Sequence, residues 1–309
     1  MLHASLVPER VLHHPLKASV LINNYNYARF LPEALASITA QTHPAHEIIV
    51  VDDGSKDDSL QVLESLRETT PNLRVHAQPN GGQLSAMRAG IEQATGDWCF
   101  FLDADDSWGD CHIANAASAI AKHPEAGVWY SGHRETEGPA LYRSKWPAGP
   151  AGPFPGLVSG TGVRIGTITS TIALRQDFAI GIASLPASLN EDWRIRADDV
   201  LLYASAFAGA IFHHSMEESV HYRIHGENAF AHNDAREVSY RKNKKLLFDI
   251  CRELNGIDPA RHLKLMVSEV LDFPPERRNR EALRRYRRAI RRLDAPFAER
   301  LSAYFATYR

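Results

Sequence analysis

The chain alternates short, almost wholly apolar runs with segments in which apolar residues recur every three or four positions. The apolar runs that we interpret as strands are "ASVLIN" (18–23), "EIIVVDD" (47–53), "LRVHAQ" (73–78), "WCFFL" (98–102) and "GVWYSG" (127–132). Apolar positions at helical spacing predict helices between them, for example at Leu31, Leu35 and Ile38 behind the first strand. This alternation predicts an α/β fold with a mostly parallel sheet flanked by helices.

The pattern changes in the second half of the chain. The segments with an interpretable pattern there are a Gly- and Pro-rich loop at 138–162, a strand leading into a turn at 167–178, and a helix at 197–209. The loop is either a disordered link or a lid over a site. From Ala235 onward the pattern is helical and increasingly basic. We therefore predict a catalytic domain over residues 1–232 and an arginine-rich helical extension over residues 233–309.

Three carboxylates follow the apolar run at 98–102 within four positions. Asp103, Asp105 and Asp106 lie where an open α/β sheet presents its ligand crevice, beyond the carboxyl ends of the strands. Carboxylates this close raise one another's pKa unless a positive charge lies between them, and a divalent cation such as Mg²⁺ suits this role. The alternative is that these residues only cap the helix that follows.

Composition narrows the class of protein. The chain has 309 residues, 44% of them hydrophobic, and a net charge of −2, so nothing in its overall charge calls for a nucleic acid partner. Three scattered cysteines without a CxxC pair indicate a reducing compartment. Without an apolar leader or a run long enough to span a bilayer, a cytoplasmic protein is expected, with peripheral contact to the inner face of the membrane as an option.

Four motifs lie in a fixed order: "NNYN" after the first strand, "VVDDGS" after the second, "LDADD" after the fourth, and "ADDVLLYASAFAG…YRIHGEN" near residues 197–228. Together they resemble the family-2 glycosyltransferases, which use nucleotide-sugars and have the Rossmann-like GT-A fold. The resemblance covers about residues 17–230. It implies an inverting, metal-dependent transfer of a sugar from a nucleoside-diphosphate donor, with Mn²⁺ or Mg²⁺ as cofactor.

The first two motifs point to the donor nucleotide. The candidate binding residues in this part of the chain are Asn23, Asn24, Tyr25, Asp53, Gly82 and Arg88. The ring of Tyr25 can stack on a nucleobase, although the same loop could simply cap a helix. The resemblance assigns the uracil or thymine contact to Asp53. Met87 stands where the family usually has an arginine, which leaves Arg88, one position later, as the candidate.

The remaining motifs point to the diphosphate and its metal. The resemblance makes "DAD" the DxD motif, with Asp103 near the ribose and Asp105 holding the metal. Asp106 either shares the metal or caps the next helix. Arg223 and His225 are expected near the diphosphate, and His225 is also a candidate metal ligand.

The resemblance also implies a general base for the acceptor hydroxyl. Asp199, the second acid of the pair at the start of the helix, is the first choice and Asp198 the second. Acids in a first helical turn also suit the helix dipole, and "NED" (190–192) is a competing acidic group. The residues expected on the acceptor side are Thr169, Ser170 and Thr171.

Other functions remain open from the sequence. A sugar-phosphate nucleotidyltransferase would share the sheet and the metal, but its glycine-rich basic loop is missing after the first strand. A non-catalytic nucleotide-sugar-binding scaffold is the other alternative. For the transferase, we expect a UDP- or dTDP-sugar donor and a glycan or lipid-linked acceptor, and family habit suggests bacterial cell-surface polysaccharide synthesis.

The C-terminal segment is strongly basic. Residues 274–309 contain eleven arginines and four acidic residues, a net charge of +7. Within 276–294, an apolar stripe at helical spacing predicts a helix, and its members are Leu283, Tyr286, Ile290 and Leu293. The stripe either packs on the catalytic domain, contacts an anionic membrane, or forms a dimer interface or a surface for an acidic glycan.

Overall fold

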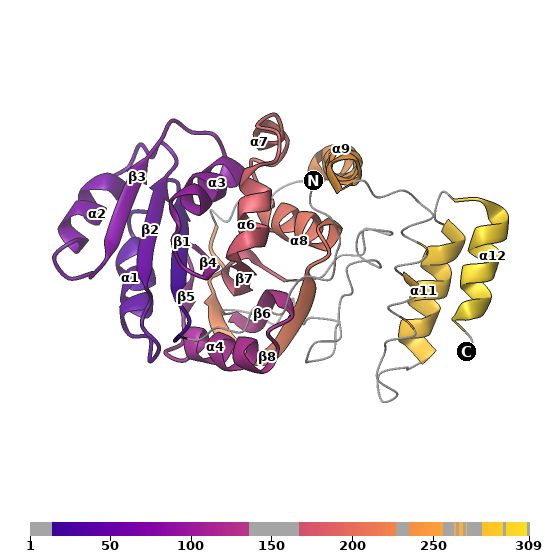
Figure 1. Ribbon diagram of the computed structural model, residues 1–309. Helices are drawn as coiled ribbons and strands as arrows, with labels where there is room; N and C mark the ends of the chain where they lie inside the picture. Colours follow the sequence, from indigo (N-terminus) through magenta and orange to yellow (C-terminus); the bar gives the residue numbers. More distant parts are fainter. Residues whose placement is uncertain are drawn as a thin grey trace.

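A mixed β-sheet forms the centre of the molecule (Figure 1). The computed structural model describes residues 14–135, 167–226, 235–255, 263, 266, 267, 270, 280–292 and 295–307. In this part of the chain the sheet has eight strands in the order β3-β2-β1-β4-β7-β6-β8-β5. The strands are β1 (Ala18–Asn24), β2 (Glu47–Asp52), β3 (Leu73–Ala77), β4 (Trp98–Asp103), β5 (Ser107–Trp108), β6 (Ala126–Glu135), β7 (Ile172–Arg175) and β8 (Ile211–Tyr222).

The sheet is parallel over its first half and mixed over its second. β1 pairs in parallel with both β2 and β4, and β2 pairs in parallel with β3. The short strand β7 then runs antiparallel to β4 and to β6, whereas β6 and β8 are parallel. In the parallel half, Asn24 is level with Asp52 and Asn23 is level with Asp103, so the polar ends of three strands meet at one edge.

Helices cover both faces of the sheet. The helices in the described part of the chain are α1 (Leu31–Thr39), α2 (Ser59–Leu66), α3 (Gln83–Gln93), α4 (His112–Lys122), α6 (Gln176–Ala183), α7 (Leu189–Asp192), α8 (Ala197–Phe207), α9 (Ala235–Asn255), α11 (Arg280–Arg292) and α12 (Phe297–Ala306), with a 3₁₀ turn η1 at Thr169–Thr171, and α11 and α12 lie away from the sheet (Figure 1). Along β4, Phe100 and Leu102 face a core shared with α1 and α4, while Cys99 and Phe101 face a core shared with α3 and α8. The run is apolar on both sides because each face is buried.

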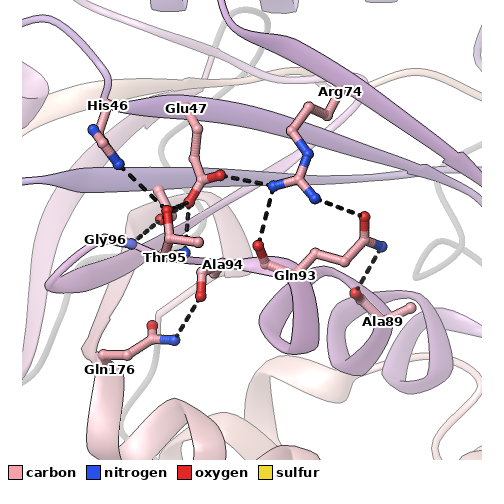
Figure 2. Close-up of polar contacts among 10 residues, drawn as sticks. His46, Glu47, Arg74, Ala89, Gln93, Ala94, Thr95, Gly96 and Gln176 are labelled. Atoms are coloured by element: carbon pink, nitrogen blue, oxygen red, sulfur yellow. Dashed lines mark hydrogen bonds and ion pairs between the residues drawn. The ribbon is translucent and has the colours of Figure 1, made fainter.

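A buried carboxylate fixes the amino-terminal edge of the sheet, away from the polar strand ends (Figure 2). Glu47 Oε1 accepts hydrogen bonds from Ser19 Oγ at 2.7 Å and from Thr95 N at 2.6 Å, and its Oε2 accepts one from Arg74 Nη1 at 3.0 Å. Burial alone would raise the pKa of Glu47, but the bonds from Thr95, Ser19 and Arg74 outweigh it and hold this pKa below its usual value. The network ties the turn between α3 and β4 to the start of β2.

The C-terminal helices join the same core rather than standing apart from it. Phe248 of α9 makes edge-to-face ring contacts with Tyr203 and Phe207 of α8, at centroid distances of 5.1 and 5.0 Å. On α11, Tyr286 and Ile290 are buried in this core, so the apolar stripe predicted there faces inward. Helix α9 shares its core with the sheet. The domain boundary expected at residue 232 stays a prediction.

Two sequence predictions lie outside the described residues: the loop at 138–162 and the side chain of Leu293. Among the helices that the structure describes, none is both long and apolar enough to cross a membrane.

Candidate active site

A cavity of about 600 Å³ opens at the carboxyl ends of β1, β2 and β4. It is lined by residues from both halves of the sheet, namely Asn23, Asn24, Tyr25, Tyr27, Asp53, Asn80, Gly82, Gln83, Ala86, Asp103, Asp105, His133, Glu135, Thr167, Ile168, Thr169, Arg194, Ile195, Arg196, Asp198, Tyr222 and Ile224. The volume lies in the range of cavities that hold a small molecule or cofactor.

The end of β1 supplies one wall of the cavity. Asn24 is buried, and its Nδ2 donates to Asp52 Oδ1 at 2.7 Å and to Ser55 Oγ at 3.2 Å. These bonds orient the amide so that Asn24 Oδ1 is buried without a hydrogen-bond partner in the described structure. Such an atom gains most from a donor on a ligand, because leaving it unsatisfied costs about 1–3 kcal/mol. The next residue, Tyr25, is 42% exposed and offers its ring to the same space.

Asp53 holds the turn that begins α3. Its Oδ1 accepts hydrogen bonds from Gln78 Nε2 and Gly81 N, both at 2.8 Å, and its Oδ2 accepts one from Gly82 N at 2.8 Å. A carboxylate has about four acceptor positions, so these bonds leave capacity for a further donor. Asp53 lines the cavity, whereas Asp52 does not.

The three carboxylates after β4 have different surroundings. Burial, and then the charge of Asp105, raise the pKa of Asp103 to about 7 against the bonds from Asn23, Thr169 and Gln83. Burial also raises the pKa of Asp105, although the bond from His225 Nε2, 3.0 Å from Asp105 Oδ2, opposes this. Asp103 and Asp105 both line the cavity.

Asp106 faces into the protein. Its Oδ2 accepts a bond from Ser170 Oγ at 2.5 Å, and its Oδ1 accepts one from Arg223 N at 2.9 Å. It is 2% exposed, and burial together with Asp105 and Asp103 raises its pKa well above the usual value. Asp106 therefore links β4 to the end of β8 instead of pointing at the cavity, and the structure gives no support for the prediction that it binds metal.

The residues at the DxD motif fit a divalent cation. Asp105 and His225 bring a carboxylate oxygen and an imidazole nitrogen together, and burial raises the pKa of both Asp103 and Asp105, so a cation beside them would stabilise their charged forms. Among the described residues, no group of three His, Cys, Asp or Glu side chains is arranged to hold an ion. Mg²⁺ and similar ions commonly take only one or two protein carboxylates and complete their shell with substrate phosphates and water. Asp105 and His225 are the residues that would hold such an ion.

Gln83 is a site residue that the sequence analysis missed. Its Nε2 donates to Asp103 Oδ1 at 3.2 Å, and its Oε1 accepts from Ala197 N at 3.0 Å at the start of α8. One side chain thus joins Asp103, at the end of β4, to the first turn of a helix that begins 114 residues after Gln83. No local pattern could have shown this, because the partner lies on a distant element.

Gly82 brings the backbone of α3 against the backbone before α8. Its φ is +86°, and a Cβ atom on it would lie 2.6 Å from Arg194 Cα. Gln83 N and Leu84 N donate to the carbonyl oxygens of Arg194 and Trp193, at 2.9 and 3.3 Å. Glycine is required here both for the positive φ and for the close approach.

The acidic pair of α8 divides between cavity and core. Asp198 is half-buried and lines the cavity, whereas Asp199 is 3% exposed and is not among the lining residues. The residue before the helix, Arg196, is its N-cap and has a φ of +61°, an uncommon conformation for a residue with a side chain. The side chain presented to the cavity is thus that of Asp198, although the sequence favoured Asp199.

Several other predicted site residues serve the fold. Arg88 donates to the carbonyl oxygens of Ala183 and Pro186 and to Asn190 Oδ1, which holds the α6–α7 connection outside the cavity. Ser170 and Thr171 are fully buried and bond within the protein, so Thr169 is the member of that trio that lines the cavity. Arg88, Ser170 and Thr171 do not line the cavity, and their expected contacts with the donor and the acceptor stay predictions.

Arg223 and His225 lie together against Asp105, beside the cavity but outside its lining. Arg223 Nε donates to Asp105 O at 3.0 Å, and its Nη2 pairs with Glu33 Oε2 at 2.5 Å. The ring of His225 packs against Tyr27 and Phe30, with centroids 5.6 and 4.9 Å away. The structure thus brings both residues to the DxD motif, and their predicted place near the donor diphosphate stays a prediction.

Comparison with protein families identifies the chain. Residues 19–180, slightly more than half of the sequence, match the model described as "Glycosyl transferase family 2". The chain belongs to this family. The predicted family is therefore confirmed, and with it the class of glycosyltransferase enzymes.

Curated relatives agree with this family-2 assignment. An uncharacterized glycosyltransferase of Nostoc sp. is 34% identical over 227 residues, which are 69% of this chain and 66% of the relative. A PGL/p-HBAD biosynthesis glycosyltransferase of Mycobacterium bovis is 35% identical over 117 residues, which are 36% of this chain and 44% of the relative. The chain thus spans less than two thirds of the length of either relative.

Solved structures share the fold of this family-2 chain. S. aureus TarS 1-349 in complex with UDP has a TM-score of 0.62 at 20% identity, over 95% of this chain and 90% of that one. The Pyrobaculum calidifontis mannosyltransferase PcManGT, in complex with GDP-Man and Mn²⁺, has a TM-score of 0.53 at 17% identity, over 96% of this chain and 80% of that one. At these identities the similarity bears on the fold, and it confirms the predicted GT-A class.

Proposed function

We propose that the protein transfers a sugar, with inversion, from a nucleoside-diphosphate donor to a hydroxyl of a glycan or glycoconjugate. The observation that carries this proposal is one cavity that joins Tyr25 and Asp53, the DxD residues Asp103 and Asp105, and the helix-terminal acid Asp198. These groups supply, in order, a nucleotide site, a diphosphate site and a base. The binding of UDP by TarS and of GDP-Man by PcManGT supports the nucleotide-sugar class of donor.

A pyrimidine donor, a UDP- or dTDP-sugar, suits the wall formed by β1 and β2. A pyrimidine ring would stack on Tyr25, and its N–H would donate to Asp53. Stacking and this polar contact would orient the donor so that its sugar lies toward α8.

Asp105 and His225 would hold Mn²⁺ or Mg²⁺ on the donor diphosphate. When bound, the ion would neutralise the negative charge that develops on the departing nucleoside diphosphate. The fit of these two side chains, and the Mn²⁺ in the PcManGT structure, support this choice of cofactor.

Asp198 would act as the general base. The acceptor oxygen forms a bond to the anomeric carbon while the bond from that carbon to the diphosphate oxygen breaks, and the hydroxyl proton passes to the Asp198 carboxylate. The first turn of α8 favours a negative charge at this position because helix N–H groups point toward it. A single displacement from the face opposite the leaving group inverts the anomeric configuration.

A lipid-linked or surface glycan acceptor, in bacterial cell-surface polysaccharide synthesis, is the biological setting that we propose. The naming of the Mycobacterium bovis relative for PGL/p-HBAD biosynthesis supports it. The reaction would then take place on the cytoplasmic side, where nucleotide-sugars are supplied.

Asp105→Ala tests the metal site, and with it the enzymatic function. Calorimetric titration of UDP into the wild-type protein should show tighter binding with Mn²⁺ than with EDTA, and Asp105→Ala should lose this difference, a weakening of about tenfold or more in Mn²⁺. Asp58→Ala is the matched control, because Asp58 is exposed and makes no side-chain cap bond. Unchanged metal dependence in Asp105→Ala would contradict the assignment, and the absence of UDP binding by the wild-type protein would contradict the function.

A further inference from the structure

Helix α12 carries an apolar stripe on its solvent side. Phe297, Leu301 and Phe305 are 72%, 44% and 60% exposed, and they follow one another at intervals of four residues. Residues at this spacing lie on one face of a helix. The opposite part of α12 is used for packing, since Ala303 is buried in the core shared with α11. In Figure 1, α11 and α12 lie side by side, with α12 at the outer end of the molecule.

Arginines of α11 border this stripe. The guanidinium of Arg291 lies 4.9 Å from the ring centroid of Tyr304, the residue before Phe305, and Arg287 donates to Thr307 at the end of α12. Arg284 and Arg288 of α11 are exposed. The pair of helices therefore presents large apolar side chains beside a dense positive charge.

The acidic residue of α12 lies away from the stripe. Glu299 is two positions after Phe297, which places it about 200° around the helix. Among the described side chains of α12, none offsets the positive charge on the face of the stripe. This arrangement matches an interfacial helix, in which aromatic and leucine side chains enter the lipid boundary and arginines meet the phosphates of the head groups.

We propose that α12 docks on an anionic lipid bilayer through Phe297, Leu301 and Phe305, with the arginines of α11 contacting the head groups. This surface differs from the one expected from the sequence, because Tyr286 and Ile290 of the 276–294 stripe are buried. A bilayer fits better than an acidic protein, because a single straight stripe suits a flat apolar boundary and the positive charge suits a uniformly anionic surface. The proposal is independent of the proposed transferase activity.

Vesicle co-sedimentation of the full-length chain tests this surface. The wild-type protein should sediment with phosphatidylglycerol–phosphatidylcholine vesicles at low salt, less at high salt, and little with phosphatidylcholine alone, since salt screens the attraction. The variant Phe297→Ala/Leu301→Ala/Phe305→Ala should bind the anionic vesicles at least ~10-fold more weakly, because three inserted side chains are truncated. Arg284→Gln/Arg288→Gln should reduce the salt dependence.

Ile180→Ala/Met216→Ala is the matched control, since these residues are 53% and 62% exposed but lie on α6 and β8. It should bind vesicles like the wild-type protein. Circular dichroism and UDP titration show whether each variant is folded. Equal vesicle binding by wild type and the α12 variant would overturn the proposal. So would a dimeric wild type that ignores anionic vesicles and becomes monomeric in the α12 variant, because a second copy would then cover the stripe.

Discussion

Asp198 and Asp199 are one residue apart, and one residue turns a helical side chain by about 100°. That rotation decides which carboxylate can reach an acceptor hydroxyl. We expect Asp198→Asn to retain donor affinity and to lose transfer rate by about 10²–10⁴-fold, the usual effect of removing a general base.

Asp199→Asn is the matched variant for this test. Asp199 is buried, so its substitution should lower the stability of the protein more than its rate of transfer. The two variants are compared by UDP-sugar titration, thermal unfolding and the initial rate of transfer. A rate loss confined to Asp199→Asn, with unchanged donor affinity, would return the role of base to Asp199.

Gln83 is a positioning residue, and substitutions can distinguish its hydrogen bond to Asp103 from its hydrogen bond with Ala197 N. Gln83→Ala removes the hydrogen bonds to Asp103 and to Ala197 N. We expect a fall in kcat of about 10–100-fold, because Asp103 and the first turn of α8, which carries Asp198, lose their alignment. Gln83→Glu keeps an acceptor for Ala197 N but places a negative charge beside Asp103. It should raise the KM for the donor more than it lowers kcat. Equal effects of both variants on KM alone would contradict this role.

At the scale of elements, His112 joins α4 to β5, the short strand after the DxD motif. It is fully buried, its ring stacks on Trp108 at 4.3 Å, and its Nδ1 lies 2.8 Å from Ser219 Oγ. Burial lowers the pKa of His112 to about 3. The folded state therefore keeps this ring neutral at a pH where the unfolded chain would bind a proton.

The sign of the pH dependence follows from this difference. Because the folded pKa lies below the unfolded value, stability is lost as pH falls below about 6.5 and the loss levels off near pH 3. Between pH 7.5 and pH 5 this single group should cost about 2 kcal/mol of unfolding free energy. Denaturant unfolding at both pH values should show a smaller loss in His112→Asn than in the wild type. An equal loss of unfolding free energy between pH 7.5 and pH 5 in both proteins would contradict a neutral His112 in the folded state.

Strands and helices could be predicted where a single local sequence pattern determined them. The strand at 47–53 is β2 almost to the residue, and the helix expected after Gly82 is α3, because runs buried on both faces and glycine turns leave clear patterns. β8 escaped prediction because Glu217 and Glu218 are exposed on it and break the apolar run. Thr169–Thr171, expected within a strand, forms a 3₁₀ turn.

At the scale of the whole molecule, the parallel half of the sheet could be predicted and the mixed half could not. β7 enters between β4 and β6 in the opposite direction, which depends on pairing between strands some seventy residues apart. The site divides in the same way. Tyr25, Asp53, Asp103 and Asp105 lie at strand ends, so the sequence pattern could place them at the cavity, whereas Gln83 is defined by distant partners.

The close approach at Gly82 sets the width of the cavity by contact between two backbones. A side chain at residue 82 would force these backbones apart, and the Gln83 side chain spans the same elements, so neither position can vary without moving the start of α8 against α3. In the proposed transferase, the choice of sugar or acceptor would then depend on side chains such as those of His133 and Arg194, which line the cavity. The spacing of the catalytic groups would depend instead on the residues that hold α3 against the start of α8.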